Sequence, residues 1–210
     1  MFEDRPDRGV EIVLLGRSNV GKSTIMRNLT GRDVATGRRP GVTTKPTYHD
    51  WHEGDFLLTD LPGYGFMKGT SQERQDTIRT GIVRYLEVHA SSIVAGVLVL
   101  DGNAAAEIIE RHLARGDPPY ALELHELLLE LQITPVLAVN KMDKVDTRDE
   151  TLDTIGEHFG YPSPWQQWSD RIAPTVAKAG RIDPLLVALY SILEEAGHGS
   201  LRGYLPNPHQ

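Results

Sequence analysis

Hydrophobic residues along this chain alternate between two kinds of pattern. The first is a short, almost wholly apolar run, typical of a strand that is buried on both faces of a sheet. Such runs predict strands over 11–15, 93–100 and 135–139, two shorter strands over 48–52 and 56–60, and a weak strand near Ile172.

The second pattern repeats apolar residues every three or four positions, as expected for helices with one buried face. It predicts helices over 23–29, 107–115, 120–131, 148–159 and 184–195, and one whose buried face carries Ile78, Ile82, Tyr85 and Leu86. Alternating strands and helices favour an α/β fold with a mainly parallel sheet. We expect an N-terminal extension over 1–8, one domain over 9–196 and a loosely held tail over 197–210, which is rich in Gly, Pro and His.

Composition narrows the class of protein. The 210 residues are 40% hydrophobic and 24% charged, which is ordinary for one globular domain. The absence of Cys removes disulfides and thiolate chemistry. The longest apolar run, 93–100, is far shorter than a membrane span of about 20 residues, and the first residues lack the apolar segment of a signal peptide. We therefore expect a cytoplasmic protein without membrane insertion.

The net charge of −7 is unevenly distributed. Residues 1–50 carry nine Lys/Arg and six Asp/Glu, whereas residues 51–210 have a net charge of −10. This excludes a uniformly basic protein that coats nucleic acid, but leaves room for a local basic surface. Arg32, Arg38, Arg39 and Lys45 form such a cluster, either as a solvated loop or as a contact with RNA phosphates.

A glycine-rich loop follows the first predicted strand and opens the first predicted helix. Its sequence matches G-x-x-x-x-G-K-[ST], whose curled backbone and helix N-terminus bind phosphate groups. Lys22 can reach the β- and γ-phosphates, and the Ser23 hydroxyl can ligate Mg²⁺. The residues expected around the phosphates are Gly16, Arg17, Ser18, Asn19, Val20, Gly21, Lys22, Ser23 and Thr24.

Two further segments distinguish among nucleotide-binding proteins. Asp60 ends a predicted strand before Leu61, Pro62 and Gly63, so that its carboxylate can hold Mg²⁺ and the Gly63 amide can meet a γ-phosphate. The segment 140–143 spells N-K-x-D directly after another strand. Its aspartate can accept two hydrogen bonds from guanine, which adenine cannot donate.

Asn140 can tie this base pocket to the phosphate loop, the Lys141 stem can lie on the face of the base, and Asp143 selects guanine. A P-loop nucleoside or nucleotide kinase is disfavoured, because Asn140 and Asp143 would have no role in it.

These motifs, together with the form D-L-P-G-Y-G from Asp60, resemble the EngB family of ribosome-biogenesis GTPases. The resemblance covers about residues 9–196 and implies a small-GTPase-like, three-layer fold with a six-stranded sheet, GTP/GDP and Mg²⁺ as ligands, and a monomer. It implies work on large ribosomal subunits; the alternative is a GTP-dependent regulator of cell division and septation. It also implies that a Thr of the first switch closes on Mg²⁺; the segment Pro40, Gly41, Val42 and Thr43 occupies that place, and Thr44 is the neighbouring candidate for Thr43. It further implies a loop around the base at Val176, Ala177 and Lys178.

The resemblance assigns catalysis to Lys22, Thr43 and Gly63, and expects the Ala177 amide to meet the guanine O6. Tyr64 stands where many GTPases have a Gln that orients the attacking water, so the water must be positioned by backbone, a bound ion or a partner. Similar GTPases with an Asn at the position of Asn19 are often stimulated by K⁺. Asn19 is therefore either a K⁺ ligand or a residue that only shapes the loop.

Overall fold

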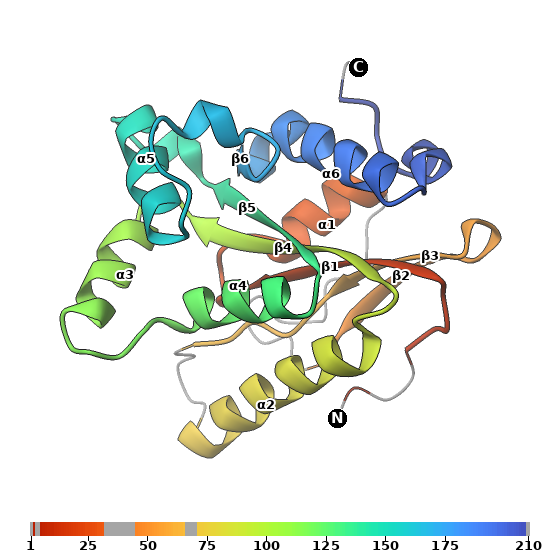
Figure 1. Ribbon diagram of the computed structural model, residues 1–210, viewed down its shortest axis with the longest axis horizontal. Coiled ribbons are helices and arrows are strands. Elements are labelled where there is room, and N and C mark those ends of the chain that lie inside the picture. The colour runs from red at the N-terminus through yellow and green to blue at the C-terminus, as the bar shows by residue number, and fades with distance from the viewer. Residues whose placement is uncertain (1, 3–4, 32–44, 66–70, 209–210) are drawn as a thin grey trace.

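The computed structural model describes residue 2 and residues 5–31, 45–65 and 71–208. Figure 1 shows a central sheet between two layers of helices. Its six strands are β1 (Val10–Gly16), β2 (Thr47–Trp51), β3 (Phe56–Asp60), β4 (Ile93–Asp101), β5 (Thr134–Asn140) and β6 (Ile172–Pro174).

The sheet has the order β2-β3-β1-β4-β5-β6. Every neighbouring pair is parallel except β2 and β3, which are antiparallel and joined by a short connection. The predicted α/β fold with a mainly parallel sheet is confirmed. Because parallel strands run in the same direction, the carboxyl ends of β1, β3, β4 and β5 lie at the same edge of the sheet. The last residues of these strands are Gly16, Asp60, Asp101 and Asn140.

The helices divide between the two faces of the sheet (Figure 1). Side chains alternate along β1: Ile12 and Leu14 pack with α1 and α6, whereas Val13 and Leu15 pack with α2 to α5. This double burial explains why the central strands are apolar at consecutive positions. The helices are α1 (Lys22–Thr30), α2 (Gln72–His89), α3 (Ala105–Leu113), α4 (Tyr120–Glu130), α5 (Arg148–His158) and α6 (Asp183–Glu195). No helix within the described ranges is long and apolar enough to cross a bilayer.

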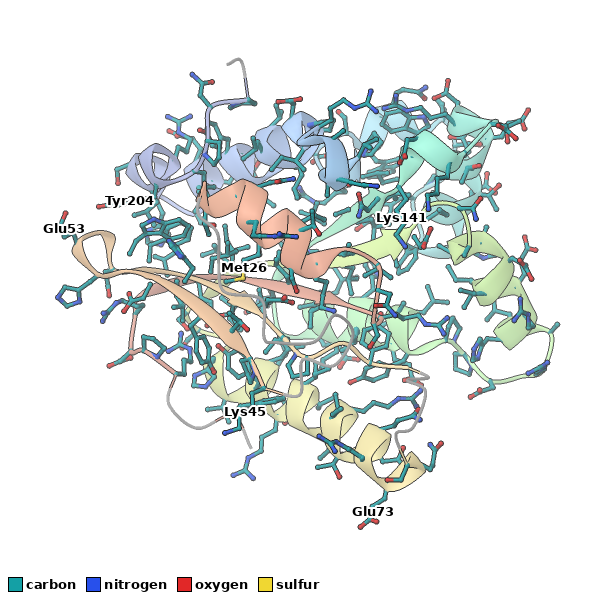
Figure 2. The ribbon with its side chains drawn as sticks, turned by 180° about the vertical axis from the view of Figure 1, so that it is seen from behind. Met26, Lys45, Glu53, Glu73, Lys141 and Tyr204 are labelled. Atoms are coloured by element: carbon teal, nitrogen blue, oxygen red, sulfur yellow. The ribbon has the colours of Figure 1, made fainter. Side chains whose placement is uncertain are left out.

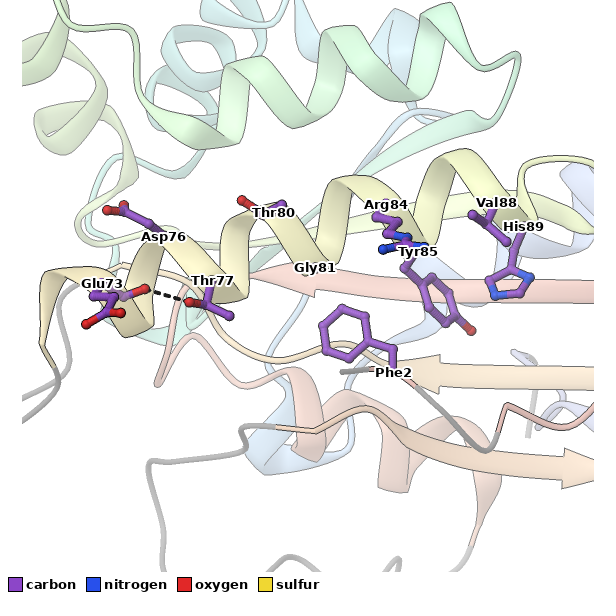
Figure 3. A pocket seen from close by; sticks show the side chains of 10 residues that line it. All are labelled: Phe2, Glu73, Asp76, Thr77, Thr80, Gly81, Arg84, Tyr85, Val88 and His89. Carbon is purple, nitrogen blue, oxygen red and sulfur yellow. Dashed lines mark hydrogen bonds between the residues drawn. The ribbon is translucent and has the colours of Figure 1, made fainter.

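The N-terminal residues pack against α2. The ring of Phe2 meets that of Tyr85 edge-on, with 6.0 Å between centroids, and the two residues line a groove of about 890 Å³ along the helix (Figure 3). Arg5 binds the buried carboxylate of Glu11 on β1. The described part of the segment 1–8 is thus joined to the domain by specific contacts.

The C-terminal segment is not loosely held, so that part of the sequence-based prediction is wrong. Residues Gly199–Tyr204 form a 3₁₀ helix, and Leu201 and Leu205 are buried in the core beneath α6. The Tyr190 hydroxyl donates to the Pro206 carbonyl at 3.0 Å. Figure 2 shows Tyr204 beside the turn between β2 and β3 that carries Glu53, far from Lys141. Packing therefore continues well beyond residue 196, because Leu201 and Leu205 join the core around α6 and Tyr204 packs near Trp51 and Phe56.

Candidate functional site

The phosphate loop joins β1 to α1 and is curled around the side chain of Lys22. Lys22 is buried, and its Nζ donates to the carbonyls of Gly16 at 3.1 Å and Arg17 at 3.3 Å. Asn19 and Gly21 have φ angles of 68° and 107°, which curl the loop before α1 begins at Lys22. The loop therefore has the backbone form and the helix N-terminus that bind phosphates.

Ser23, in the first turn of α1, meets Asp60 at the end of β3. The Ser23 Oγ donates to Asp60 Oδ2 at 2.7 Å. The other oxygen, Oδ1, is buried and has no hydrogen-bond partner among the described residues. A hydroxyl beside an unpaired buried carboxylate oxygen is a donor set that suits Mg²⁺, so these two predicted ligands fit the ion.

Lys22 and Asp60 share a buried environment that disfavours both charges. Burial lowers the pKa of Lys22 and raises the pKa of Asp60, and the attraction between the two groups opposes each shift. A bound phosphate and a divalent cation would supply the missing counter-charges. The site is therefore arranged for a charged ligand rather than for stability of the empty protein.

Asn140 connects three segments that are far apart in the sequence. Its Nδ2 donates to the Val20 carbonyl at 2.8 Å, and its Oδ1 accepts from the Thr175 hydroxyl at 3.2 Å and the Ala177 amide at 2.9 Å. The predicted tie between the base segment and the phosphate loop is thus present. A Cβ on Gly21 would collide with the Asn140 amide nitrogen, so only glycine fits where the two segments meet.

Lys141 lies across the mouth of the same region. Its Nζ donates to the Asn19 carbonyl at 2.8 Å and to Asp101 at 2.6 Å, so that the side chain joins the phosphate loop to the end of β4. The expected contact of its stem with a base stays a prediction. Asp143 is exposed at the rim. No sequence motif pointed to Asp101, although this residue ends an apolar strand just as Asp60 does, and that position is a signal by which it could be found.

The base loop is held by contacts with Asn140 and Arg181. The Ala177 amide donates to Asn140 Oδ1 at 2.9 Å, and the expected contact of this amide with the guanine O6 stays a prediction. Val176 is also engaged, because its amide donates to the Arg181 carbonyl at 2.8 Å. The next amide, that of Lys178, comes from an exposed residue in the same turn. Thr175 is a second missed residue, and its role depends on a contact with Asn140 that no local motif reveals.

The turn after Asp60 lies against the phosphate loop. A Cβ on Gly63 would come within 2.8 Å of the Ser18 hydroxyl, and the Ser18 amide donates to the Tyr64 carbonyl at 3.1 Å. The Leu61 and Tyr64 side chains are buried on the α2 face. Tyr64 therefore packs in the core, in agreement with its exclusion as a water-orienting residue.

The remaining predicted residues divide into two groups. Arg17, Thr24 and Pro62 lie within or beside the two phosphate-facing turns. The predicted first-switch residues lie outside the described part of the chain, so their placement stays a prediction: Pro40, Gly41, Val42, Thr43 and Thr44.

Comparison with known proteins identifies the family. Residues 11–141 match the family model described as "50S ribosome-binding GTPase". The chain is 53% identical over 201 residues to a "Probable GTP-binding protein EngB" of Halorubrum lacusprofundi, covering 96% of this chain and 98% of the relative.

Solved structures agree with this result. A crystal structure of "a probable GTP-binding protein engB" superposes with a TM-score of 0.80 at 39% identity, over 89% of this chain and all of that one. NFeoB from S. thermophilus bound to GDP·AlF4⁻ and K⁺ shares the fold, with a TM-score of 0.52 at 22% identity over 90% of this chain and 61% of that chain. With its phosphate loop, Asp60 turn and N-K-x-D segment assembled at one sheet edge, the chain belongs to the EngB family of P-loop GTPases, which bind and hydrolyse GTP.

Proposed function

We propose that this GTPase is a nucleotide-controlled switch that acts on large ribosomal subunits during their assembly. The observation that carries the proposal is the match of residues 11–141 to a family described as 50S ribosome-binding GTPases. That description names a ribosomal subunit and not cell division, so we favour the ribosome over the septation alternative. We propose that the protein acts in the cytoplasm and as a monomer.

The switch would be driven by contacts with the γ-phosphate. The Asp60–Gly63 turn is joined through Tyr64 to the phosphate loop, so a phosphate that binds the Gly63 amide would reposition the start of α2. We propose that Mg²⁺ is held by Ser23, Asp60 and Thr43. When bound, the ion neutralises charge on the phosphate oxygens.

Co-sedimentation with 50S particles tests the ribosomal role. We expect the protein to pellet with the particles in a non-hydrolysable GTP analogue at least about tenfold more than in GDP, a typical switch coupling. Asp143→Asn should lose this difference and regain it in xanthosine nucleotides. Equal pelleting in both nucleotides by a protein that binds GTP would refute the ribosomal switch without affecting the GTPase assignment.

The basic cluster is a candidate contact with ribosomal RNA. Lys45 is exposed, and Arg32, Arg38 and Arg39 lie outside the described residues. We expect Lys45→Glu to weaken 50S binding by severalfold at low salt, with a smaller effect at high salt, because phosphate contacts are screened. Glu53→Lys on the β2–β3 turn is a comparison that also alters an exposed charge but leaves this cluster intact.

We also propose that Asn19 helps to hold K⁺ beside the phosphates. Asn19 is exposed on the curled loop, and a similar fold has been solved with GDP·AlF4⁻ and K⁺ bound. Replacing Na⁺ by K⁺ at constant ionic strength should accelerate hydrolysis more than it changes GTP affinity, because the ion stabilises charge that builds in the transition state. Asn19→Ala should abolish the difference, and equal wild-type rates in the two salts would exclude the K⁺ role.

A further inference from the structure

The base loop is a closed turn between β6 and α6. The Val176 amide donates to the Arg181 carbonyl at 2.8 Å, and the Arg181 amide donates to the Val176 carbonyl at 3.3 Å. Between these residues the chain makes one 3₁₀ turn, in which the Gly180 amide donates to the Ala177 carbonyl at 3.1 Å. These hydrogen bonds fix the shape of the turn, but they do not fix its place relative to the phosphate loop.

The place of the turn depends on Ala177, whose backbone is bound from both sides. Ala177 is buried in the same core cluster as Ile25 and Leu29 of α1. Its amide donates to Asn140 Oδ1 at 2.9 Å, and its carbonyl accepts from Asn28 Nδ2 at 2.7 Å. The Asn28 and Asn140 side chains therefore hold the two peptide groups that flank one residue.

Asn28 joins the base loop to the helix that begins in the phosphate loop. It is partly buried on α1, which starts at Lys22, and it lies 149 positions before Ala177 in the sequence. Figure 1 shows α1 beside α6, the helix into which the base loop leads, on one face of the sheet. Asn28 lies outside the phosphate-loop motif over 16–23, so no motif assigns it a role. Its contact fixes the base loop relative to the element that holds the phosphates.

The same contact sets the direction of the next amide. A trans peptide is planar, so the Ala177 carbonyl and the Lys178 N–H point in opposite directions. Because the carbonyl points to Asn28 on α1, the Lys178 N–H points away from that helix. The other backbone amides from 176 to 181 all donate to described acceptors, and the Lys178 amide is not used in the turn. It is therefore a donor whose direction is fixed in advance.

We propose that Asn28 is a positioning residue for guanine recognition. By holding the Ala177 carbonyl, Asn28 keeps the amides of the base loop where they can donate to the guanine O6. Guanine presents an acceptor at this position and adenine presents an amino donor, so well-placed amides also disfavour adenine. The inference rests on the predicted contact of this loop with O6, and it does not depend on the ribosomal role.

Two nucleotide analogues separate the O6 contact from the rest of the base pocket. In 6-thio-GDP a sulfur, which is a weaker acceptor, replaces O6, whereas the groups expected to pair with Asp143 are retained. Inosine diphosphate keeps O6 and lacks the 2-amino group. Competition with a fluorescent GDP analogue in Mg²⁺ measures the affinities. We expect Asn28→Ala to weaken GDP and inosine diphosphate alike, by about five- to tenfold, and 6-thio-GDP by less than about twofold.

Further variants control for folding. Alanine is a strong helix former, so Asn28→Ala should fold, and urea denaturation checks this. Asn28→Asp keeps the size of the side chain but removes the donor, so it should reproduce the pattern. Thr30→Ala removes a hydroxyl that donates to the Arg27 carbonyl within α1, and it should bind all three nucleotides like the wild type.

Three results would overturn the proposal. The first is unchanged GDP affinity in folded Asn28→Ala, and the second is equal weakening of GDP and 6-thio-GDP, which would mean that the loss does not pass through O6. The third is equal affinity of the wild type for GDP and 6-thio-GDP, which would remove the base loop from O6. None of these results bears on the ribosomal role, which co-sedimentation measures.

Discussion

Single residues at the sheet edge decide whether the site can form, and Gly21 is the clearest example. Its φ of 107° strains any other residue, and a Cβ would displace the Asn140 amide. We expect Gly21→Ala to weaken GDP binding by at least about tenfold, because the strain and the collision together exceed about 1.4 kcal/mol. Titration with a fluorescent GDP analogue measures this effect.

Gly31 provides the matched control for this substitution. It has a φ of 62° at the end of α1, but a Cβ there would meet nothing within 4 Å. Gly31→Ala should lower stability by about 1 kcal/mol and leave GDP affinity unchanged. If both variants bound GDP like the wild type, the contact between Gly21 and Asn140 would have no role in the site.

Asp143 is also a single-residue determinant: its side chain is exposed, and we expect its carboxylate to accept two hydrogen bonds from guanine. Asp143→Asn should weaken GTP binding by about 10²-fold or more, because a charged two-pronged pair is lost. The variant should gain affinity for xanthosine triphosphate, whose 2-oxo group can accept from the new amide. Competition between the two nucleotides measures the switch, and wild-type preference for GTP in the variant would remove Asp143 from the base pocket.

At the scale of elements, a buried polar cluster near the start of β1 joins segments that are distant in the sequence. Glu11, on β1, is fully buried and accepts hydrogen bonds from Arg5, Thr59 on β3 and Tyr85 on α2. One carboxylate thereby joins the N-terminal segment, two strands and the helix that follows the switch turn. This explains how a charged residue occurs within an otherwise apolar strand.

Arg5→Ala tests that cluster. The substitution would leave the Glu11 carboxylate buried without a cation, so we expect a loss of about 3 kcal/mol in the free energy of unfolding. Urea denaturation followed by circular dichroism measures it. Arg8→Ala, which removes a more exposed pair with Asp50, should change the midpoint little. Similar midpoints for both variants would show that Glu11 does not need Arg5.

At the scale of the whole molecule, the C-terminal segment completes the core. Leu201 and Leu205 are buried, and Tyr204 lies against the β2–β3 turn near Trp51. A chain that ends at residue 196 would expose this surface. We expect truncation there to destabilise the fold by roughly 3 kcal/mol or more, from the loss of two buried leucines alone.

Thermal and urea unfolding of the truncated chain measure this loss. Leu205→Ala should reproduce part of it, whereas Val187→Ala, at an exposed position on α6, should not lower stability. A truncated chain as stable as the full one would restore residue 196 as the end of the packed domain.

Local sequence determined much of this protein. Apolar runs specified the central strands because both faces of a parallel sheet are covered, so that burial is visible without knowing the partners. The phosphate loop, the Asp60 turn and the N-K-x-D segment could also be predicted from the sequence. Each of them follows directly from the end of a strand, and its backbone form is set by residues within a few positions.

Only the tertiary structure decided the features that depend on distant partners. The Ala177 amide is engaged by Asn140, Lys141 is held by Asp101, and the Tyr64 hydroxyl is buried without a partner among the described residues. The tail after residue 196 carries Gly, Pro and His, which favour a loose segment locally, yet its leucines meet an open apolar surface on α6. Burial and pairing are properties of two surfaces together, so residues of one segment cannot reveal them until the fold has brought the second segment into contact.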